Sequence, residues 1–118
     1  MTTKEIGEFG ENEACRFLEK KGIEILKRNY SCRVGEIDII ARDGETYVFC
    51  EVKTRNRSDY GNPAEFVDYK KQERIIKTAL YYTMRDDLDM RFDVVEVYYR
   101  MAGDCAAVTG INHIENAF

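Results

Sequence analysis

The sequence predicts one α/β domain in which helices flank a central mixed sheet. Two stretches with apolar residues at helical spacing stand on either side of shorter apolar runs, and those runs surround an Asp43-Gly44 turn signal. The chain has 118 residues, which fits one domain, and it contains no internal repeat, low-complexity tract or linker. We therefore expect a single unit over residues 1–118 with the element order α-β-β-β-α-β.

The first half of the chain is expected to hold one helix and three strands. The helix spans residues 4–21 and ends at Gly22, because its apolar residues recur near helical spacing. These residues are Ile6, Phe9, Ala14, Phe17 and Leu18. The strands are expected over residues 23–30, 34–42 and 45–55, and the last two form a hairpin.

The second half is expected to hold one helix and one clear strand. Residues 56–64 are polar and carry the only proline, Pro63, which predicts a loop. Residues 65–85 predict a long helix, residues 91–99 predict a strand, and a weak pattern indicates one more strand at about 104–109. The expected apolar face of the long helix consists of Tyr69, Ile76, Ala79 and Leu80.

The composition argues against several classes of protein. No apolar run approaches the ~20 residues of a membrane span, and the N-terminus has no signal-peptide core, so we expect a cytoplasmic protein without membrane contact. The four cysteines are widely spaced, and the single His113 cannot complete a zinc site. The net charge of −4 argues against a protein that coats nucleic acid.

Three charged residues, Asp38, Glu51 and Lys53, interrupt the apolar strands of the hairpin. Charges in a buried strand are costly unless they are paired or bind a metal. The residues around them are apolar on both faces, which predicts an interior pair of strands with Cys50 as a small core residue. These charges are the strongest indication of function in the chain.

The register of the hairpin predicts which side chains share a face. A two-residue loop at Asp43-Gly44 would place Glu36 opposite Glu51 and would make Asp38 a diagonal neighbour of Glu51, roughly 7–8 Å away at the backbone. Like charges placed opposite each other call for a cation between them. Because side chains alternate, one face would hold Glu36, Asp38, Glu51 and Lys53, and the other Ile37, Ile39, Val48, Cys50 and Val52.

Two carboxylates and a lysine on one strand pair suit metal-assisted hydrolysis of a phosphodiester. Mg²⁺, or Mn²⁺ in its place, prefers oxygen ligands, which Asp38, Glu51 and the Val52 carbonyl would supply. Lys53 would position or help deprotonate the attacking water and offset charge at phosphorus. The simpler interpretation of a Glu-x-Lys pattern is an exposed, ion-pairing strand edge.

Other polar residues are candidates for contact with nucleic acid. Glu36 either binds the metal through water or only orders the water around it. Arg55 follows the hairpin within a basic group and is a candidate phosphate contact. Lys71 and Gln72, on the long helix, either contact substrate phosphate or belong to a solvated helix surface, and the sequence favours neither alternative.

Two segments, Gly35-Glu36-Ile37-Asp38-Ile39-Ile40-Ala41 and Phe49-Cys50-Glu51-Val52-Lys53-Thr54-Arg55, closely resemble the YraN-like family of bacterial proteins. The resemblance covers nearly the whole chain. Its other motifs are Gly7-x-x-Gly10-Glu11-x-x-Ala14, Arg28-Asn29, Tyr60-Gly61-x-Pro63, Lys71, Arg91-Phe92-Asp93-Val94 and the ending Asn116-Ala117-Phe118.

The family is similar to the restriction-endonuclease-like superfamily, and most similar to archaeal Holliday-junction resolvases. The resemblance implies that fold, a divalent metal and a catalytic site at Asp38, Glu51 and Lys53. It also implies an acidic residue from the first helix. Helix spacing leaves Glu11 and Glu13 open for that residue, and the resemblance selects Glu11.

The leading hypothesis is a metal-dependent endonuclease that acts on structured or branched DNA, with a homodimer as the form that would cut symmetric substrates. One alternative is a nucleic-acid-binding module that keeps the fold without catalysis. Another is a scaffold for other DNA-processing proteins, which the net charge of −4 fits better than it fits tight binding to DNA.

Overall fold

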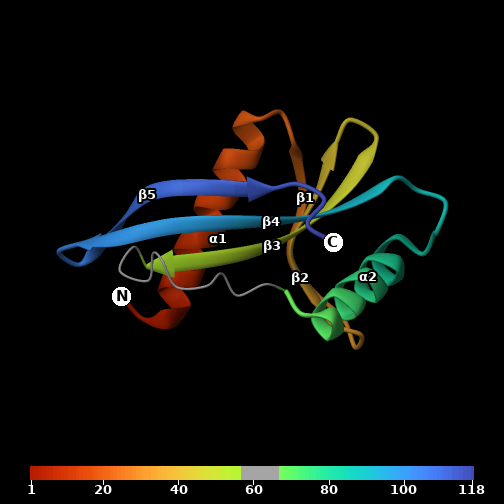
Figure 1. Ribbon diagram of the computed structural model, residues 1–118, viewed down its shortest axis with the longest axis horizontal. Helices are drawn as coiled ribbons and strands as arrows, with labels where there is room; N and C mark the ends of the chain where they lie inside the picture. Colours follow the sequence, from red (N-terminus) through yellow and green to blue (C-terminus); the bar gives the residue numbers. More distant parts are fainter. Residues whose placement is uncertain (57–66) are drawn as a thin grey trace.

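The computed structural model describes residues 1–56 and 67–118, which form two helices and five strands (Figure 1). The predicted loop over residues 56–64 lies outside the described residues from residue 57 on. The elements are, in order, α1 (Thr3–Lys20), β1 (Glu24–Ser31), β2 (Glu36–Asp43), β3 (Thr46–Asn56), α2 (Tyr69–Thr83), β4 (Met90–Ala102) and β5 (Cys105–Ile114). The α/β class is confirmed, with one strand more than the predicted order.

The sheet is mixed and follows the chain, in the order β1-β2-β3-β4-β5. Only β3 and β4 pair in parallel, and parallel neighbours need a crossover connection, which here contains α2. β5 is longer than the weak pattern at 104–109 indicated, because it pairs with β4 from Cys105 to Ile114. It is an edge strand with no fully buried residue, so its hydrophobic pattern is faint.

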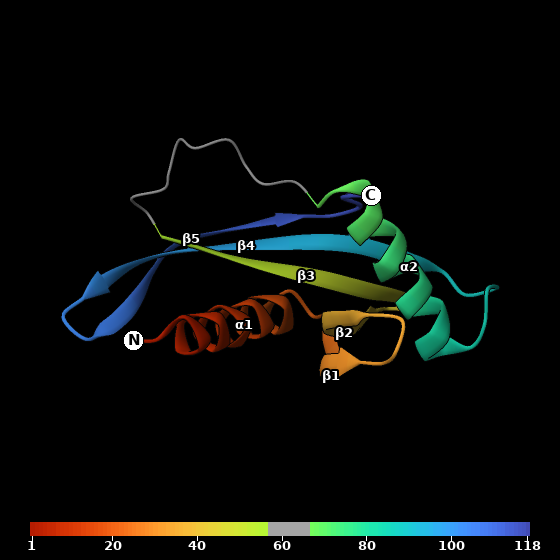
Figure 2. The ribbon, with the colours of Figure 1, turned by 90° about the horizontal axis from the view of Figure 1, so that it is seen from below.

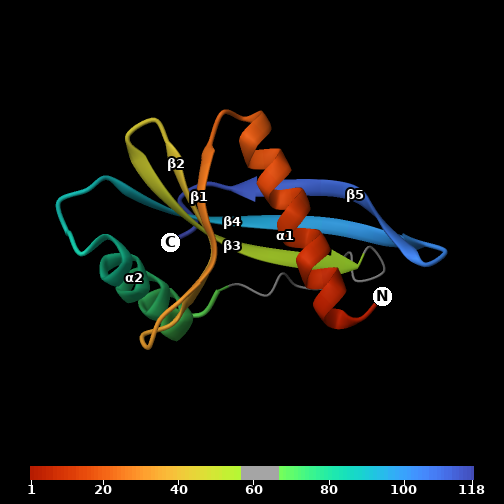
Figure 3. The same cartoon turned by 180° about the vertical axis from the view of Figure 1, so that it is seen from behind.

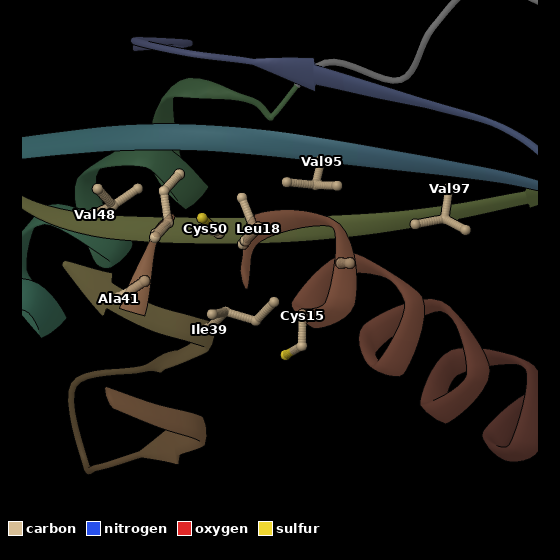
Figure 4. Close-up of a cluster of buried hydrophobic side chains, with 10 residues drawn as sticks. Cys15, Leu18, Ile39, Ala41, Val48, Cys50, Val95 and Val97 are labelled. Carbon is tan, nitrogen blue, oxygen red and sulfur yellow. The ribbon is translucent and has the colours of Figure 1, made fainter. Parts of the chain in front are cut away.

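The two helices cover different faces of the sheet. α1 packs over the middle of β3, β4 and β5, whereas α2 lies near the β1–β2 hairpin (Figures 2 and 3). Along β3 the side chains alternate. Val48 and Cys50 enter the buried cluster beneath α1, here called the α1 cluster, which includes Leu18 (Figure 4). Phe49 enters the buried cluster beneath α2, the α2 cluster, which includes Ala79. The prediction of a hairpin covered on both faces, with Cys50 in the core, is confirmed.

The buried face of α2 differs from the predicted one. Tyr69 is 88% exposed, and Ile76 and Leu80 are also exposed, so three of the four residues assigned to the apolar face were wrong and only Ala79 is buried. The inward stripe also contains the fully buried Thr78. Its hydroxyl donates to the Arg74 carbonyl at 2.7 Å, which satisfies the polar group inside the helix. Counting apolar residues alone misses such a stripe.

The hairpin register also differs from the predicted one. Asp43 pairs with Thr46, so the loop is Gly44-Glu45, and Gly44 takes the left-handed φ of +62° that the turn requires. The observed pairing of β2 with β3 is shifted by two positions from the predicted one. Because side chains alternate with a period of two, Glu51 remains on the face of Phe49. The prediction that Glu36 lies opposite Glu51 is wrong.

The start of β2 departs from simple alternation. The ladder between β2 and β3 ends at the pair Ile39–Cys50, and the residues before Ile39 pair only with β1. Ile37 packs in the α2 cluster, whereas Ile39 packs in the α1 cluster, so the predicted common face of these two residues is wrong. The two strands separate at Asp38, where the candidate site begins.

Candidate functional site

Asp38 lies where β2 separates from β3. Its Oδ2 accepts a hydrogen bond from the backbone N–H of Val52 at 2.8 Å. The backbone ladder between β2 and β3 has already ended at the pair Ile39–Cys50. The carboxylate therefore gives the Val52 N–H an acceptor in place of a backbone carbonyl of β2. This hydrogen bond thus holds the Asp38 side chain against β3, next to Glu51, at the point where the two strands separate.

The environment of Asp38 opposes its negative charge. Burial, followed by the nearby charge of Glu51, raises its pKa to about 7, although the bond from the Val52 N–H acts in the opposite direction. The charge of Glu11 also raises the pKa, and that of Lys71 lowers it. Near neutral pH this carboxyl group is therefore divided between its neutral and charged forms.

Glu51 is buried and is held between two ammonium groups. Lys71 Nζ donates to its Oε1 at 2.5 Å, and Lys53 Nζ lies 3.8 Å from the same oxygen. Burial acts to lower the pKa of Lys71, but the hydrogen bond and charge of Glu51 outweigh burial and raise it. Lys71 therefore stays cationic and neutralises much of the charge of Glu51.

The segment before α2 sets the position of Lys71. The Asp68 side chain caps the helix by accepting from the Lys71 backbone N–H at 2.8 Å. The Gln72 side chain donates to the Val67 carbonyl at 2.8 Å. The amide of Gln72 thus fixes the entry into α2, whereas Lys71 reaches Glu51.

Glu11 faces the interior from α1. Its Oε1 is buried and has no hydrogen-bond partner among the described residues, although Arg28 Nη2 lies 3.7 Å away. Glu13, the other candidate of the first helix, instead pairs with the exposed Arg16 at 2.7 Å. The structure thus turns Glu11, and not Glu13, toward the charges around Asp38.

Two other predicted residues lie outside this cluster. Arg55 Nε donates to Glu96 at 2.9 Å, and Glu96 also accepts from the Asn112 side chain. Glu36 lines a pocket of about 470 Å³ between the β1–β2 turn and α2. The structure therefore brings together Asp38, Glu51, Lys53 and Lys71 and places Glu11 within electrostatic range. Arg55 and Gln72 have other partners, and Glu36 lies in the adjoining pocket that Lys71 also lines.

The sequence did not identify Lys71 as a partner of Glu51. It showed Arg33 and Arg74 only as members of two basic groups that could contact phosphate, and not as residues that line one pocket. Their basic character is plain in the sequence, but their convergence depends on a turn and a helix far apart in the chain. Gly35 was the available signal, because a glycine often marks a close approach of the backbone to a neighbouring element.

The donor set suits a small divalent cation that completes its coordination with other ligands. Within residues 1–56 and 67–118, no three His, Cys, Asp or Glu side chains converge closely enough to hold a metal ion alone. Asp38 and Glu51 supply two carboxylates, and Mg²⁺ commonly takes one or two, together with water and substrate phosphate. The Oε1 of Glu11, which accepts no hydrogen bond from a described residue, is a further acceptor nearby.

Comparison with known proteins groups this chain with a set of bacterial sequences. A family model described as "Uncharacterised protein family UPF0102" matches residues 10–97. Proteins named only as UPF0102 proteins are 45% identical in Caldicellulosiruptor saccharolyticus, 48% in Caldicellulosiruptor bescii and 44% in Clostridioides difficile, each over 100% of both chains. Neither helix in the described part of the chain is long and apolar enough to cross a membrane.

Proposed function

The chain belongs to the uncharacterised protein family UPF0102, and we propose that it is a metal-dependent endonuclease that hydrolyses phosphodiester bonds in structured or branched DNA. One observation carries the proposal. The half-buried carboxylate of Asp38 and the buried carboxylate of Glu51 sit together where two strands separate, and the ammonium groups of Lys53 and Lys71 meet Glu51 there. The resemblance to archaeal Holliday-junction resolvases supports the choice of branched DNA.

The residues that would hold the cation are Asp38, Glu51 and the Val52 carbonyl, with Glu11 as an additional acceptor. Mg²⁺ or Mn²⁺, when bound, supplies Lewis acidity and a more acidic water molecule. The high pKa of Asp38 supports a cation here, because a positive charge would favour its ionised form.

The two lysines have different tasks in this proposal. Lys53, on the same strand as Glu51, positions the attacking water and offsets the charge that develops at phosphorus. Lys71, from α2, holds Glu51 in place and is the cation nearest to an incoming phosphate. Neither task requires a rearrangement of the sheet.

The proposal extends to the cellular setting and the assembly. We place the protein in the cytoplasm with DNA as its partner, and as a homodimer when it cuts a symmetric junction. Sedimentation velocity with and without a four-way junction measures this directly. A species of one 13.8 kDa chain per junction at saturation would contradict the dimer.

A second candidate function is a non-catalytic nucleic-acid-binding or scaffold protein that keeps this fold. The pairing of Lys71 with Glu51, and of Arg55 with Glu96, favours it, because both cations that were assigned to phosphate are already satisfied. The net charge of −4 points the same way.

Cleavage assays separate the two candidates. Purified protein is incubated with four-way junction, flap and linear duplex DNA, with Mg²⁺ or Mn²⁺, beside the variants Glu51→Ala and Glu73→Ala. Glu73 is an exposed glutamate on α2 whose ion pair among the described residues is with Lys77, so it serves as the matched control. We expect metal-dependent cleavage that Glu51→Ala abolishes and Glu73→Ala preserves. Cleavage that survives Glu51→Ala would sink the proposal, and binding without cleavage would favour the second candidate.

A further inference from the structure

A pocket of about 470 Å³ lies between the β1–β2 turn and α2, and three of its lining side chains are cationic. Figures 1 and 3 show this turn beside the N-terminal half of α2. The lining residues are Cys32, Arg33, Val34, Gly35, Glu36, Lys71, Arg74 and Ile75. The pocket thus gathers basic side chains from two segments that are far apart in the chain.

The two walls of the pocket are held firmly together. A Cβ atom on Gly35 would meet the Thr78 hydroxyl at 2.8 Å, so the turn reaches α2 at a distance that only glycine permits. Cys32 and Gly35 exchange backbone hydrogen bonds of 2.9 and 3.3 Å, which close the turn. Arg33 is therefore carried on a closed turn that is packed against the helix bearing Arg74.

The arginines of the pocket differ from most others in the described part of the chain. Within residues 1–56 and 67–118, neither Arg33 nor Arg74 forms an ion pair, and Glu36 is the only carboxylate that lines the pocket. Six other described arginines each have a carboxylate within ion-pair distance: Arg16, Arg28, Arg42, Arg55, Arg85 and Arg91. Two guanidinium groups on a concave surface are therefore available for an anion.

We propose that this pocket binds a backbone phosphate of nucleic acid, next to the phosphodiester on which the Asp38–Glu51 pair acts. The position of that neighbouring phosphodiester rests on the function proposed above, whereas the binding of nucleic acid does not. Lys71 connects the two places, because its side chain lines the pocket and its Nζ binds Glu51. Guanidinium groups recognise phosphate through paired, directed hydrogen bonds.

The lining of the pocket also predicts what kind of recognition it provides. No aromatic ring is among the lining residues in the described part of the chain, so these walls offer no surface on which a base would stack. Contacts with phosphate oxygens fix position along the strand and carry no sequence information directly. The substrate class is therefore nucleic acid that is recognised by its backbone, without a sequence preference from this pocket.

Binding measurements over a range of salt concentrations test the proposal. Fluorescence anisotropy with labelled junction and duplex DNA, in EDTA, compares the wild-type chain with Arg33→Gln, Arg74→Gln and the double variant. Arg100→Gln is the matched control, because Arg100 is exposed, lies on β4 outside the pocket and forms no ion pair among the described residues. All three positions of change are solvent-exposed, and circular dichroism checks that each of the four variants is folded.

The expected result is a change in the salt dependence as well as in affinity. The slope of log K against log salt should fall in magnitude by about 1 for the double variant, since the pocket neutralises one phosphate and each neutralised phosphate contributes about 0.9, and each single variant should weaken binding. Arg100→Gln should leave the slope unchanged. Variants that match Arg100→Gln in slope and affinity would overturn the proposal. So would inorganic phosphate that binds through Arg33 and Arg74 in a protein whose affinity for DNA does not depend on these residues, because the pocket would then serve a free anion.

The outcome is separable from that of the proposed nuclease. Binding is measured without metal, so an arginine-dependent slope in a protein that never cuts DNA supports the pocket and refutes the catalytic proposal. Conversely, if Glu51-dependent cleavage is found with an unchanged kcat/KM in Arg33→Gln and Arg74→Gln, the nuclease stands and the pocket is refuted.

Discussion

Asp38 shows how one residue can conflict with its surroundings for a functional reason. Burial and the neighbouring Glu51 both oppose its ionisation, and the one hydrogen bond that its side chain makes to a described residue comes from the Val52 N–H. Such groups cost stability, and they concentrate at sites where a ligand relieves the conflict. In the metal-free protein this conflict has a measurable dependence on pH.

Replacing Asp38 by asparagine should stabilise the metal-free protein at high pH. The pKa of about 7 lies above the ordinary value of 3.8, so the stability from this group is complete below pH 3.8 and is lost as pH rises through 7. Asp38→Asn should therefore be more stable than wild type by roughly 2–4 kcal/mol at pH 8, with little gain at pH 4. Urea unfolding in EDTA between pH 4 and 8 measures this, and a gain that is independent of pH would contradict it.

Asp93 is a buried carboxylate of the opposite kind, and it lies outside the candidate site. It is fully buried on β4 and accepts hydrogen bonds from the Arg91 side chain, from His113 Nε2 at 2.7 Å and from the Asn116 N–H. Burial acts to raise the pKa of Asp93, but these partners outweigh burial and lower it. The cluster ties the end of the chain to the sheet.

Removing the Asp93 carboxylate should destabilise the fold strongly. Asp93→Ala leaves the buried charge of Arg91 without this partner, which should cost about 3–5 kcal/mol, whereas Asp87→Ala removes only an exposed pair with Arg85 and should change stability little. The lowered pKa means that the contribution of Asp93 is present above pH 3.8 and is lost as pH falls through its native pKa. Urea unfolding at pH 7 and acid titration below pH 4 test both points; equal effects of the two variants would refute this role.

At the scale of elements, the contact between α1 and β3 depends on glycine. Gly10 is buried, and a Cβ atom there would lie 1.8 Å from the Thr54 hydroxyl. The same helix carries Gly7, three residues earlier, where a Cβ atom would meet nothing within 4 Å. Close packing therefore requires a glycine at position 10, whereas the surroundings of Gly7 do not require one. Gly10 also directly precedes Glu11 in α1.

Alanine at these two positions should change stability in opposite directions. Gly10→Ala forces α1 away from β3 and should cost about 1–3 kcal/mol, as overpacking does. Gly7→Ala should stabilise the protein by about 0.5–1 kcal/mol, because alanine loses less conformational freedom than glycine in a helix. Thermal and urea unfolding of the pair give the result, and a gain of stability in Gly10→Ala similar to that in Gly7→Ala would show that helix propensity, not close packing, governs this contact.

At the scale of the whole molecule, the parallel pairing of β3 and β4 explains why Lys71 meets Glu51. Parallel neighbours cannot be joined by a tight turn, so the chain crosses over between them, and α2 belongs to that crossover. α2 packs on the face of β3 that carries Phe49, which is also the face of Glu51. The topology of the sheet thus brings a lysine from a distant segment to the candidate site.

Binding of Mn²⁺ should stabilise the whole chain through this site. A ligand that binds only the native state adds about 2.7 kcal/mol at a concentration of 100 times its Kd. We expect Mn²⁺ to raise the Tm of wild type, and to leave the Tm of Glu51→Gln unchanged while Glu73→Gln behaves as wild type. An equal rise of Tm in Glu51→Gln would show that the cation binds elsewhere.

The sequence by itself determined the features that depend on local periodicity. Alternation along β3 placed Glu51 and Lys53 on one face, and the two-position error in the turn left that face unchanged because strands repeat every two residues. Helical spacing located α1 to within a residue at each end. The conflict between charge and apolar surroundings at Asp38 and Glu51 was also visible, since it involves only neighbours in the chain.

The tertiary structure alone decided which distant groups meet. The contact of Lys71 with Glu51, the pairing of Arg55 with Glu96 and the pocket between Arg33 and Arg74 join segments that local patterns do not relate. The burial of Thr78 in place of Tyr69 is of the same kind, since the face of α2 is chosen by what it packs against. Periodicity reports the geometry of one element, whereas these contacts depend on the crossover and on the packing of helices against the sheet.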